Sequence, residues 1–366
     1  MGGETNEHTE FEIPKEGLAG VVKNEGPNFE IEVKKVPVPE IGPEDVLIKL
    51  NATGLCMSDV HFMLNDWDLP FMSSYGTICA GHEGAGVIVK VGERVKTLKV
   101  GQRAGMKPVF DCCHNCIQCK TGRDNYCPNT VHTGLHVDGT YKQYLRSPER
   151  YTVTIPDGVH DYVAAPVMCS ASTIYAALKA SGIKPGQWAC FPGGGGGVGI
   201  QGVQLASAMG MRPVVVDTGA QRKALAESLG AEAFVDFKEI ENPVDKVVEI
   251  TDGGAHAVFV TAIQAYPTCL DYMGTRPGAT TVCIGLPPKG DYHIDVDPTR
   301  MVFYGQSVQG SFVSTLGDID ETLDFAKRGK LHLDPTVVGL SKWNESVQKL
   351  KNGQVAGRVV VDFNLP

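Results

Sequence analysis

A glycine-rich stretch after residue 192 constrains the fold of this 366-residue chain more than any other feature. It reads Gly193-Gly194-Gly195-Gly196-Gly197-Val198-Gly199, between a short apolar strand expected at 188–191 and an expected helix that ends at Gly210. Backbone without Cβ atoms lets N–H groups at a helix N-terminus approach phosphate oxygens closely. The pattern therefore predicts a dinucleotide-binding strand-loop-helix unit, in which Gly193, Gly196, Gly197, Val198 and Gly199 approach the pyrophosphate.

The surroundings of this loop separate a binding site from a flexible linker or a tight turn. Asp217 lies 18 residues beyond Gly199, at the end of a strand expected at 214–217. A carboxylate there accepts hydrogen bonds from the ribose hydroxyls of adenosine and repels a 2′-phosphate. The acid favours NAD over NADP, and nearby Arg222 keeps NADP open as the alternative.

The chain changes character near residue 170. Before it, short strands alternate with glycine and proline turns, which is typical of antiparallel β structure. After it, a helix expected at 172–181 leads into strands that alternate with helices, which indicates a parallel sheet with right-handed crossovers. Beyond the strands already mentioned, we expect strands at 45–50, 86–92, 257–260, 281–284, 308–312 and 359–363. The last of these is expected to rejoin the first region.

These patterns predict an α/β plus β fold with two domains. A mostly antiparallel β domain comprises residues 1–169 and a return segment at 313–366, and a Rossmann-type parallel-sheet domain comprises residues 170–312. The composition is 42% hydrophobic and 20% charged, which is typical of a soluble globular protein. No run approaches the roughly 18 unbroken apolar residues of a membrane helix.

Charge and the N-terminus exclude several partners. The chain has 33 basic and 42 acidic residues, a net charge of −9, and no basic patch, so nucleic-acid binding is not expected. Residues 1–14 are polar and acidic and lack the apolar core of a secretory signal. Asn6 stands where myristoylation of Gly2 requires Ser or Thr, so we expect a frayed, untethered terminus and a cytoplasmic protein.

Five of the eleven cysteines lie within residues 112–127. In a reducing compartment this crowding favours metal ligation over disulfides. Four thiolates that converge from one loop form a closed tetrahedral site, as in structural zinc centres, and the spacing selects Cys113, Cys116, Cys119 and Cys127. Free thiols or a redox pair are the alternative, and Cys112 is expected to be a bystander.

A second set of metal-type residues is dispersed along the chain: Cys56, His82 and Cys169. Two thiolates and one imidazole would leave the fourth position of a zinc ion open, as Lewis-acid chemistry requires. By spacing alone, each cysteine is better explained as a buried core residue and His82 as a core histidine with satisfied hydrogen bonds.

Taken together, these residues resemble the zinc-dependent medium-chain alcohol dehydrogenases, most closely the yeast and fungal cytosolic branch. The resemblance extends from about residue 17 to residue 363. Besides the four-cysteine loop, its markers are Gly81-His82-Glu83-Gly84-Ala85-Gly86-Val87, Ala165-Pro166-Val167-Met168-Cys169, Gly196-Gly197-Val198-Gly199, Val235-Asp236-Phe237 and Val355-Ala356-Gly357-Arg358-Val359-Val360-Val361-Asp362.

The resemblance implies a GroES-like β domain, NAD, two zinc ions per chain and a role for each matching residue. Cys56, His82 and Cys169 match the ligands of the catalytic zinc, Asp59 the acid that orients the zinc histidine, and Glu83 an acid behind the metal. Ser58 matches the hydroxyl that bonds the alcohol oxygen, and His61 the histidine that ends a proton relay to solvent. Asp217 and Arg222 match the groups that hold the adenosine ribose, and Arg358 the arginine that pairs with pyrophosphate.

The expected reaction interconverts a primary or secondary alcohol and its aldehyde or ketone. Trp67, Pro108 and Leu286 are expected to line the substrate pocket, although Leu286 could equally be an ordinary core leucine. Pro108 replaces a pocket tryptophan of the yeast enzymes, which implies a wider pocket for bulky, benzylic or allylic alcohols. Met57 replaces a histidine or arginine near the pyrophosphate, so weaker NAD binding is expected.

Three other functions compete with this interpretation. A zinc-free quinone or enoyl reductase of the same superfamily would lack Cys56, His82 and Cys169. An NADP-dependent aldehyde reductase of secondary metabolism would have the same fold. A zinc-stabilised binding module is opposed by the net charge and the glycine loop. Because yeast-type relatives are tetramers, a homotetramer is expected, with a dimer as the alternative.

Overall fold

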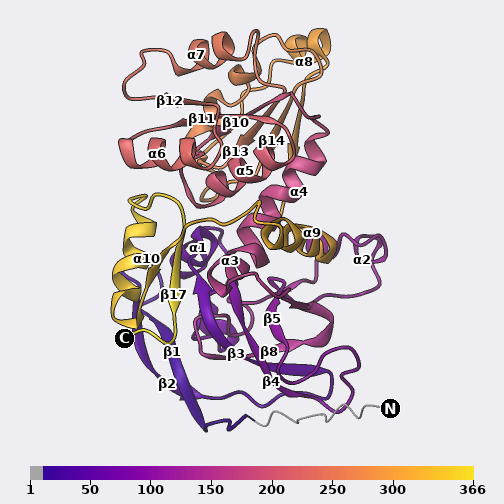
Figure 1. Cartoon of the computed structure of the whole chain (residues 1–366), viewed down its shortest axis with the longest axis vertical. Helices are drawn as coiled ribbons and strands as arrows, with labels where there is room; N and C mark the ends of the chain where they lie inside the picture. The colour runs from indigo at the N-terminus through magenta and orange to yellow at the C-terminus, as the bar shows by residue number, and fades with distance from the viewer. Residues whose placement is uncertain (1–10) are drawn as a thin grey trace.

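Two sheets organise residues 11–366, the part of the chain that this computed structural model describes. Figure 1 shows the parallel sheet and its helices above and the mostly antiparallel sheet below. The expectations about Gly2, Asn6 and the frayed terminus fall on residues outside the described part. The predicted fold class, a Rossmann-type sheet joined to a mostly antiparallel β region, is confirmed.

The lower sheet has seven strands in the order β16-β17-β3-β4-β5-β9, with β8 also paired to β3. Their bounds are β3 (Asp45–Gly54), β4 (Gly84–Val91), β5 (Arg103–Met106), β8 (Tyr144–Pro148), β9 (Thr152–Thr154), β16 (Thr336–Val338) and β17 (Val359–Asp362). β17, which contains most of the predicted tail strand, pairs antiparallel with β3. The C-terminal segment therefore rejoins the first region, as the sequence predicted.

Smaller elements surround this sheet. β1 (Glu16–Lys23) and β2 (Glu30–Pro37) form an antiparallel hairpin, and β6 (Val109–Asp111) pairs with β7 (Val131–His132). The helices of this region are α1 (Met57–Leu64), α2 (Ile117–Lys120), α3 (Asp161–Pro166), α9 (Leu316–Lys327) and α10 (Trp343–Lys351). Short helical turns lie at η1 (Met72–Tyr75), η2 (Asp124–Tyr126), η3 (Glu149–Tyr151) and η7 (Leu340–Lys342).

The upper sheet has six parallel strands in the order β12-β11-β10-β13-β14-β15. Their bounds are β10 (Trp188–Pro192), β11 (Arg212–Asp217), β12 (Ala233–Asp236), β13 (Ala257–Val260), β14 (Thr280–Cys283) and β15 (Ser307–Gly310). After β12 the chain crosses to the other side of β10, so the strand order reverses between β10 and β13. Ligands of such sheets bind at this switch point, beyond the carboxyl ends of the strands.

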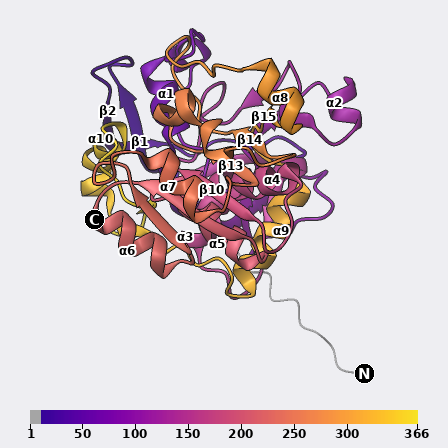
Figure 2. The same ribbon diagram turned by 90° about the horizontal axis from the view of Figure 1, so that it is seen from above.

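Helices cover both faces of the parallel sheet, as Figure 2 shows from above. They are α4 (Ser172–Ser181), α5 (Gly197–Ala208), α6 (Ala220–Ser228) and α7 (Pro243–Ile250), with short turns at η5 (Ile263–Thr268) and η6 (Asp271–Met273). α8 (Pro298–Tyr304) precedes the edge strand β15 and has no buried residue. Successive side chains of a strand point to opposite faces. Phe191 and Phe259 therefore pack into the core with α4 and α5, while Cys190 and Val258 pack into the core with α7. Burial on both faces explains why these strands are continuously apolar.

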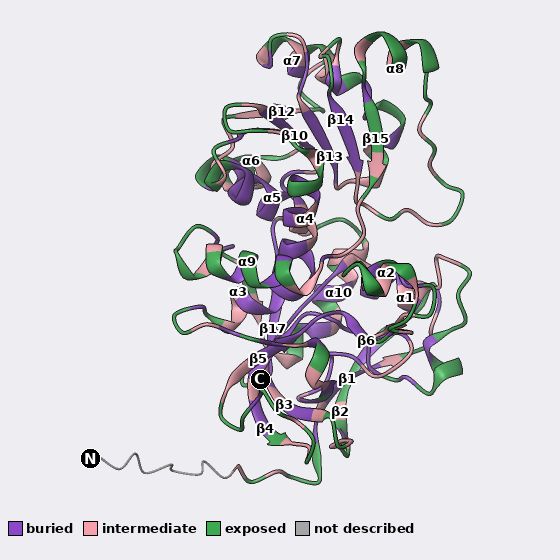
Figure 3. Ribbon diagram, turned by 90° about the vertical axis from the view of Figure 1, so that its right-hand side faces the viewer, coloured by how far each residue is buried: buried purple, intermediate pink, exposed green. Residues whose placement is uncertain are grey.

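A long helical run joins the two sheets. It comprises α3, the π-helical turn η4 (Val167–Ala171) and α4. The run Asp161–Ser181 is long and apolar enough to cross a membrane by length and composition, although the sequence contains polar interruptions. In the protein 78% of its most apolar window is buried, the pattern of a core helix, and Figure 3 shows it among the buried elements. The predicted domain boundaries at 169/170 and 312/313 remain predictions.

Candidate active site

The glycine loop joins β10 to α5 without room for side chains. Gly193 has a φ of +85°, and a Cβ atom there would lie 2.6 Å from the Cβ of Ala262, which follows β13. A Cβ on Gly199 would lie 2.4 Å from the carbonyl oxygen of Gly193. These approaches exclude larger residues, and they bring the N-terminus of α5 to the switch point of the sheet.

A cavity of about 480 Å³ opens between this loop and α1. The predicted cofactor residues that line it are Gly193, Gly196, Gly197, Val198, Gly199, Arg222 and Arg358, together with Met57, Ser58 and His61. Asp217 lies behind this lining, buried at the end of β11. Its carboxylate accepts hydrogen bonds from Gly195 N at 2.9 Å and from Arg222 Nη1 at 3.0 Å.

Arg358 links this cavity to the lower region of the protein. The side chain is 4% exposed, and its guanidinium lies against Gly197 and donates to the carboxylate of Glu83. The Nε atom of Arg358 is buried without a hydrogen-bond partner. A buried, unpaired donor next to a glycine cradle fits the phosphate oxygens of a dinucleotide.

Cys56, His82, Cys169 and Glu83 meet in one buried cluster, which we call the open cluster. Cys56 precedes α1, His82 precedes β4, and Cys169 lies in η4, so three distant segments supply them. Their candidate ligand atoms lie within 4.8 Å of one another. A donor set of two thiolates and an imidazole suits zinc, and the core-residue alternative does not explain why the three converge.

Asp59 orients the histidine of this cluster. It is fully buried, and its Oδ1 lies 2.6 Å from His82 Nδ1 and 3.1 Å from Gly81 N. Burial alone lowers the pKa of His82, but the charges of Asp59 and Cys56 outweigh burial and hold that pKa well above its usual value. Because Nδ1 is engaged by Asp59, Nε2 is the atom left for a metal ion.

Glu83 is tied back toward the helix and the cofactor cavity. Its Oε1 accepts a hydrogen bond from Ser170 N at 3.3 Å, and its Oε2 accepts one from Arg358. Burial raises the pKa of Glu83 to about 7, against the opposing charge of Arg358. Both oxygens are thus engaged, and the carboxylate connects the open cluster to the arginine of the dinucleotide cavity.

The second cysteine set lies in a lobe formed by residues 113–127, which we call the four-cysteine lobe. The Sγ atoms of Cys116 and Cys119 are 3.5 Å apart, those of Cys113 and Cys127 are 3.5 Å apart, and those of Cys113 and Cys119 are 3.9 Å apart. Four sulfurs placed about 2.3 Å from a tetrahedral zinc ion would lie roughly 3.8 Å from one another. The spacing therefore fits one zinc ion with no open position.

Backbone amides stabilise the thiolates of the lobe. Hydrogen bonds from the N–H groups of Asn115 and Cys116 lower the pKa of Cys113 to about 6, and Asn129 N lies 3.4 Å from Cys127 Sγ. Cys112 Sγ approaches Cys119 Sγ to 3.5 Å, but it also lies 3.0 Å from Tyr151 Oη. Cys112 thus lies beside the four candidate ligands and outside their set.

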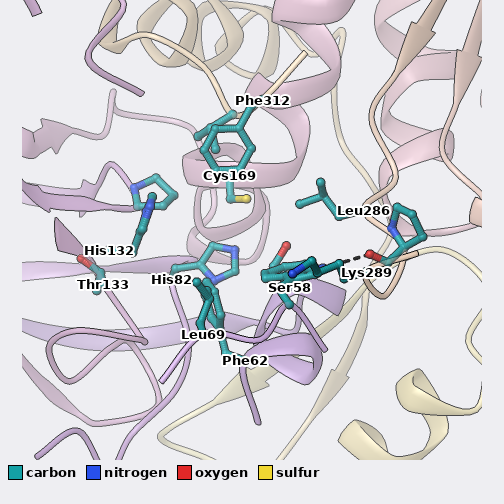
Figure 4. Close-up of a pocket in the computed structure, with 14 residues that line it drawn as sticks. Ser58, Phe62, Leu69, His82, His132, Thr133, Cys169, Leu286, Lys289 and Phe312 are labelled. Atoms are coloured by element: carbon teal, nitrogen blue, oxygen red, sulfur yellow. Dashed lines mark hydrogen bonds between the residues drawn. The ribbon is translucent and has the colours of Figure 1, made fainter. Parts of the chain in front are cut away.

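A separate cavity of about 420 Å³ adjoins the open cluster. Figure 4 shows its lining, to which the open cluster contributes His82 and Cys169. The predicted pocket residues Trp67, Pro108 and Leu286 all line it, with Ser58, Phe62, Leu69, His132, Thr133, Pro287, Lys289, Phe312 and Val313. Ser58 and Leu286 line both this cavity and the dinucleotide cavity, so the two spaces meet there.

The sequence did not reveal the partner of His61. Its Nδ1 lies 2.6 Å from Asp66 Oδ2. The centres of the His61 and Trp67 rings lie 5.0 Å apart, and the ring planes are tilted by 36°. The His61 side chain is 6% exposed, and that of Asp66 is 20% exposed. Asp66 is therefore the more exposed member of this pair. A separation of five residues matches neither the period of a helix nor that of a strand. The two side chains meet only because the chain turns after α1.

His132 and Phe312 were also missed. Both line the substrate cavity, and their rings lie 6.2 Å apart in an edge-to-face arrangement. Burial lowers the pKa of His132 to about 4, so its imidazole is neutral at physiological pH. These residues are 180 positions apart, and no local motif surrounds either of them.

A dinucleotide cradle joined to an apolar cavity with an open-sided Cys/His cluster defines a zinc-binding dehydrogenase. Family models agree: residues 42–157 match the alcohol dehydrogenase GroES-like domain, and residues 197–328 match the zinc-binding dehydrogenase domain. The chain belongs to the zinc-type, medium-chain alcohol dehydrogenase family. The family predicted from the sequence motifs is thereby confirmed.

Individual relatives match over nearly the whole chain. Alcohol dehydrogenase of Schizosaccharomyces pombe is 36% identical, and alcohol dehydrogenase 1 of Neurospora crassa is 37% identical; each match covers 96% of this chain and 99% of the relative. Among solved structures, a zinc-binding dehydrogenase of Sinorhizobium meliloti bound to NADP has a TM-score of 0.81 at 26% identity, covering 96% of this chain and all of that one. Acetophenone reductase of Geotrichum candidum in complex with NAD has a TM-score of 0.79 at 26% identity, covering 96% and 99%.

Proposed function

We propose that this protein is an NAD-dependent zinc alcohol dehydrogenase that interconverts a primary or secondary alcohol and its aldehyde or ketone. One observation carries the proposal: the open cluster and the dinucleotide cavity meet at a shared apolar pocket, with Ser58 on the boundary. A hydride donor and acceptor must approach within van der Waals distance, and this boundary is where a nicotinamide and an alcohol would meet.

Two zinc ions per chain follow from the two donor sets. Cys56, His82 and Cys169 would hold the catalytic ion, and Cys113, Cys116, Cys119 and Cys127 would hold the structural one. The catalytic ion supplies Lewis acidity toward the alcohol or carbonyl oxygen when it is bound. The protein's own contribution is to orient His82 through Asp59 and to exclude water with the apolar walls around Trp67 and Leu286.

Proton movement is assigned to three side chains. The Ser58 hydroxyl, at the boundary of the two cavities, would accept the proton of the substrate hydroxyl and release its own proton toward His61. His61 lines the dinucleotide cavity and would take up that proton, and its imidazolium, oriented by Asp66, would release a proton to solvent. The hydrogen bond between His61 and Asp66 supports this direction, because Asp66 is the more exposed partner.

The choice of NAD rests on Asp217. Its charge at the end of β11 disfavours a 2′-phosphate, and the hydrogen bond from Arg222 engages the basic residue that would otherwise favour NADP. Solved relatives contain either cofactor, so an NADP-dependent aldehyde reductase is the second candidate. We expect a higher kcat/KM with NAD than with NADP, and a smaller ratio in Asp217→Ser.

A substrate panel combined with metal analysis tests the whole proposal. We expect two zinc ions per chain, NAD-dependent oxidation of alcohols, and a higher kcat/KM for benzyl alcohol than for ethanol. The last expectation rests on Pro108 and on the cavity volume of about 420 Å³, and it extends to other bulky, benzylic or allylic alcohols. A preference for ethanol would refute the wide pocket, and absence of turnover with every alcohol and both cofactors would refute the proposed activity.

The oligomeric state and the location are part of the proposal. Val302 and Phe303 on α8 are 82% and 80% exposed, next to the edge strand β15, and such a patch suits self-association. We expect a homotetramer, or failing that a dimer, in sedimentation velocity. None of the eleven cysteines forms a disulfide, as suits a cytoplasmic protein.

A further inference from the structure

The wall of the substrate cavity contains a strained residue. Val313 has a φ of 55°, and it is the sole β-branched residue with positive φ among the described, non-glycine residues. For a β-branched side chain this conformation is a genuine outlier, because Cβ and its branches collide with the backbone. Such strain persists only where neighbouring contacts enforce it. Val313 and its neighbour Phe312 both line the cavity.

The enforcing contacts come from the four-cysteine lobe. Asn125 Nδ2 donates to the carbonyl oxygen of Phe312 at 2.6 Å, and Phe312 N donates to the hydroxyl of Tyr126 at 3.1 Å. The rings of Tyr126 and Phe312 lie 6.4 Å apart. Both backbone polar groups of Phe312 are therefore held by η2, the helical turn between the ligands Cys119 and Cys127.

The same turn holds a second part of the cavity wall. Asp124 Oδ1 lies 2.6 Å from Lys107 Nζ, and Lys107 is fully buried. Lys107 precedes Pro108, which lines the cavity. Asn125 itself is only 7% exposed. Replacing the hydrogen bond of its side-chain amide by one to water therefore costs free energy. The lobe thus reaches the cavity at two places through three consecutive residues.

We propose that the four-cysteine lobe sets the shape of the substrate cavity through Asn125 and Tyr126, which hold Phe312 and the strained Val313 in place. These two are positioning residues, since they contact the wall and not the substrate. The inference rests on the proposed alcohol dehydrogenase function. Without the two hydrogen bonds, Val313 relaxes to negative φ and the ring of Phe312 moves relative to His132.

Asn125→Ala and Tyr126→Phe test the hydrogen bonds. Each is expected to change the ratio of kcat/KM for benzyl alcohol to that for ethanol by about fivefold, the value of one net hydrogen bond, while KM for NAD stays constant. Ile117→Ala, in the same lobe but with a side chain 68% exposed, is the matched control and should leave the ratio unchanged. Zinc content must remain two per chain, and if Asn125→Ala loses a zinc ion, Tyr126→Phe alone decides.

A double-mutant cycle tests the strain. Val313→Ala and Val313→Gly both remove the side chain, but only glycine adopts positive φ without cost. Asn125→Ala is therefore expected to keep its effect in the Val313→Ala background and to lose most of it in the Val313→Gly background. An unchanged ratio in both lobe variants, or equal effects in the two backgrounds, would overturn the inference.

A binding measurement separates this inference from the proposed activity. Dissociation constants of 4-fluorobenzyl alcohol and 2-fluoroethanol, measured by ¹⁹F NMR on the zinc-loaded protein, require no turnover. If the wild-type protein oxidises no alcohol, the proposed function fails, yet the ratio of the two constants still tests the lobe. We expect that ratio to change about fivefold in Asn125→Ala and Tyr126→Phe and to stay constant in Ile117→Ala.

Discussion

The two cysteine-containing clusters of this protein are built in opposite ways. The four-cysteine lobe takes all its ligands from one short segment, and two of its Sγ–Sγ separations are 3.5 Å. The open cluster takes its candidate ligands, all of them buried, from three distant segments, and it adjoins an apolar cavity. A closed set of four sulfurs stabilises a fold, whereas an incomplete set leaves a coordination position for substrate.

The surroundings of the two clusters differ in the same sense. In the lobe, backbone N–H groups contact the sulfurs, so the local chain conformation itself stabilises thiolates. At the open cluster, the contacts come from buried side chains: Asp59 holds His82, and Glu83 connects the cluster to Arg358. The comparison teaches that the first cluster should respond to mutation with lost stability and the second with lost activity.

The largest effect should come from His82→Ala. We expect kcat/KM for alcohol oxidation to fall by roughly 1000-fold, because Lewis-acid catalysis is worth several kcal/mol. Zinc should fall to one ion per chain by elemental analysis, while the unfolding temperature changes little. His293→Ala, on an exposed loop, is the control. An activity within tenfold of that of the wild-type protein would contradict the catalytic role of the open cluster.

Cys127→Ser tests the structural role of the four-cysteine lobe. Loss of the lobe's zinc should lower the unfolding temperature by roughly 10 °C, since structural zinc contributes directly to folding free energy. Differential scanning calorimetry with zinc analysis measures both effects. Cys112→Ser is the matched control, because its sulfur lies beside the cluster and outside the ligand set. Zinc loss in Cys112→Ser would show that the ligand set is wrong.

Asp59→Asn sharpens the comparison within the open cluster. The substitution keeps the shape but removes the charge that orients His82, so affinity for the catalytic zinc should fall roughly 10- to 100-fold. Competition with a chelator measures this affinity. Asp66→Asn is the counterpart, because Asp66 contacts His61 and no metal ligand of the cluster. It should lower kcat without changing zinc affinity; a matching loss of zinc in Asp66→Asn would contradict the assignment.

The smallest effect is expected for Met57→His, at the border between α1 and the dinucleotide cavity. A charge-assisted hydrogen bond to the pyrophosphate should lower KM for NAD about fivefold. Both zinc ions should remain, and Met57→Leu should behave as wild type. Steady-state kinetics at saturating alcohol measure this, and equal cofactor constants in all three proteins would refute it.

Some elements could be predicted because their determinants are local. The helix expected at 172–181 coincides with α4, and the strand expected at 257–260 coincides with β13. The run of glycines predicts the backbone conformation of its loop, since close approach and positive φ exclude other residues. The proximity of the four cysteines of the lobe belongs to the same group, because fifteen residues contain all of them.

Other features needed the family resemblance. Cys56, His82 and Cys169 carry no mutual spacing, so only comparison with a known family indicated that they belong together. The structure brings them into one cluster because β3 pairs with β4, and α3, which continues into η4, packs against both strands. Glu83 was expected behind the metal, but its tie to Arg358 across 275 positions was not.

By itself, the sequence determined the parallel sheet with its glycine loop, the return of the C-terminal strand and which four cysteines lie together in the lobe. The tertiary structure alone decided that Asp66 pairs with His61 and that Asn125 holds Phe312 beside a strained Val313. The physical reason is the separation, along the chain, of the residues that determine each feature. Backbone conformation and ligand spacing are short-range properties of the chain, whereas a pocket wall depends on contacts between segments that only folding brings together.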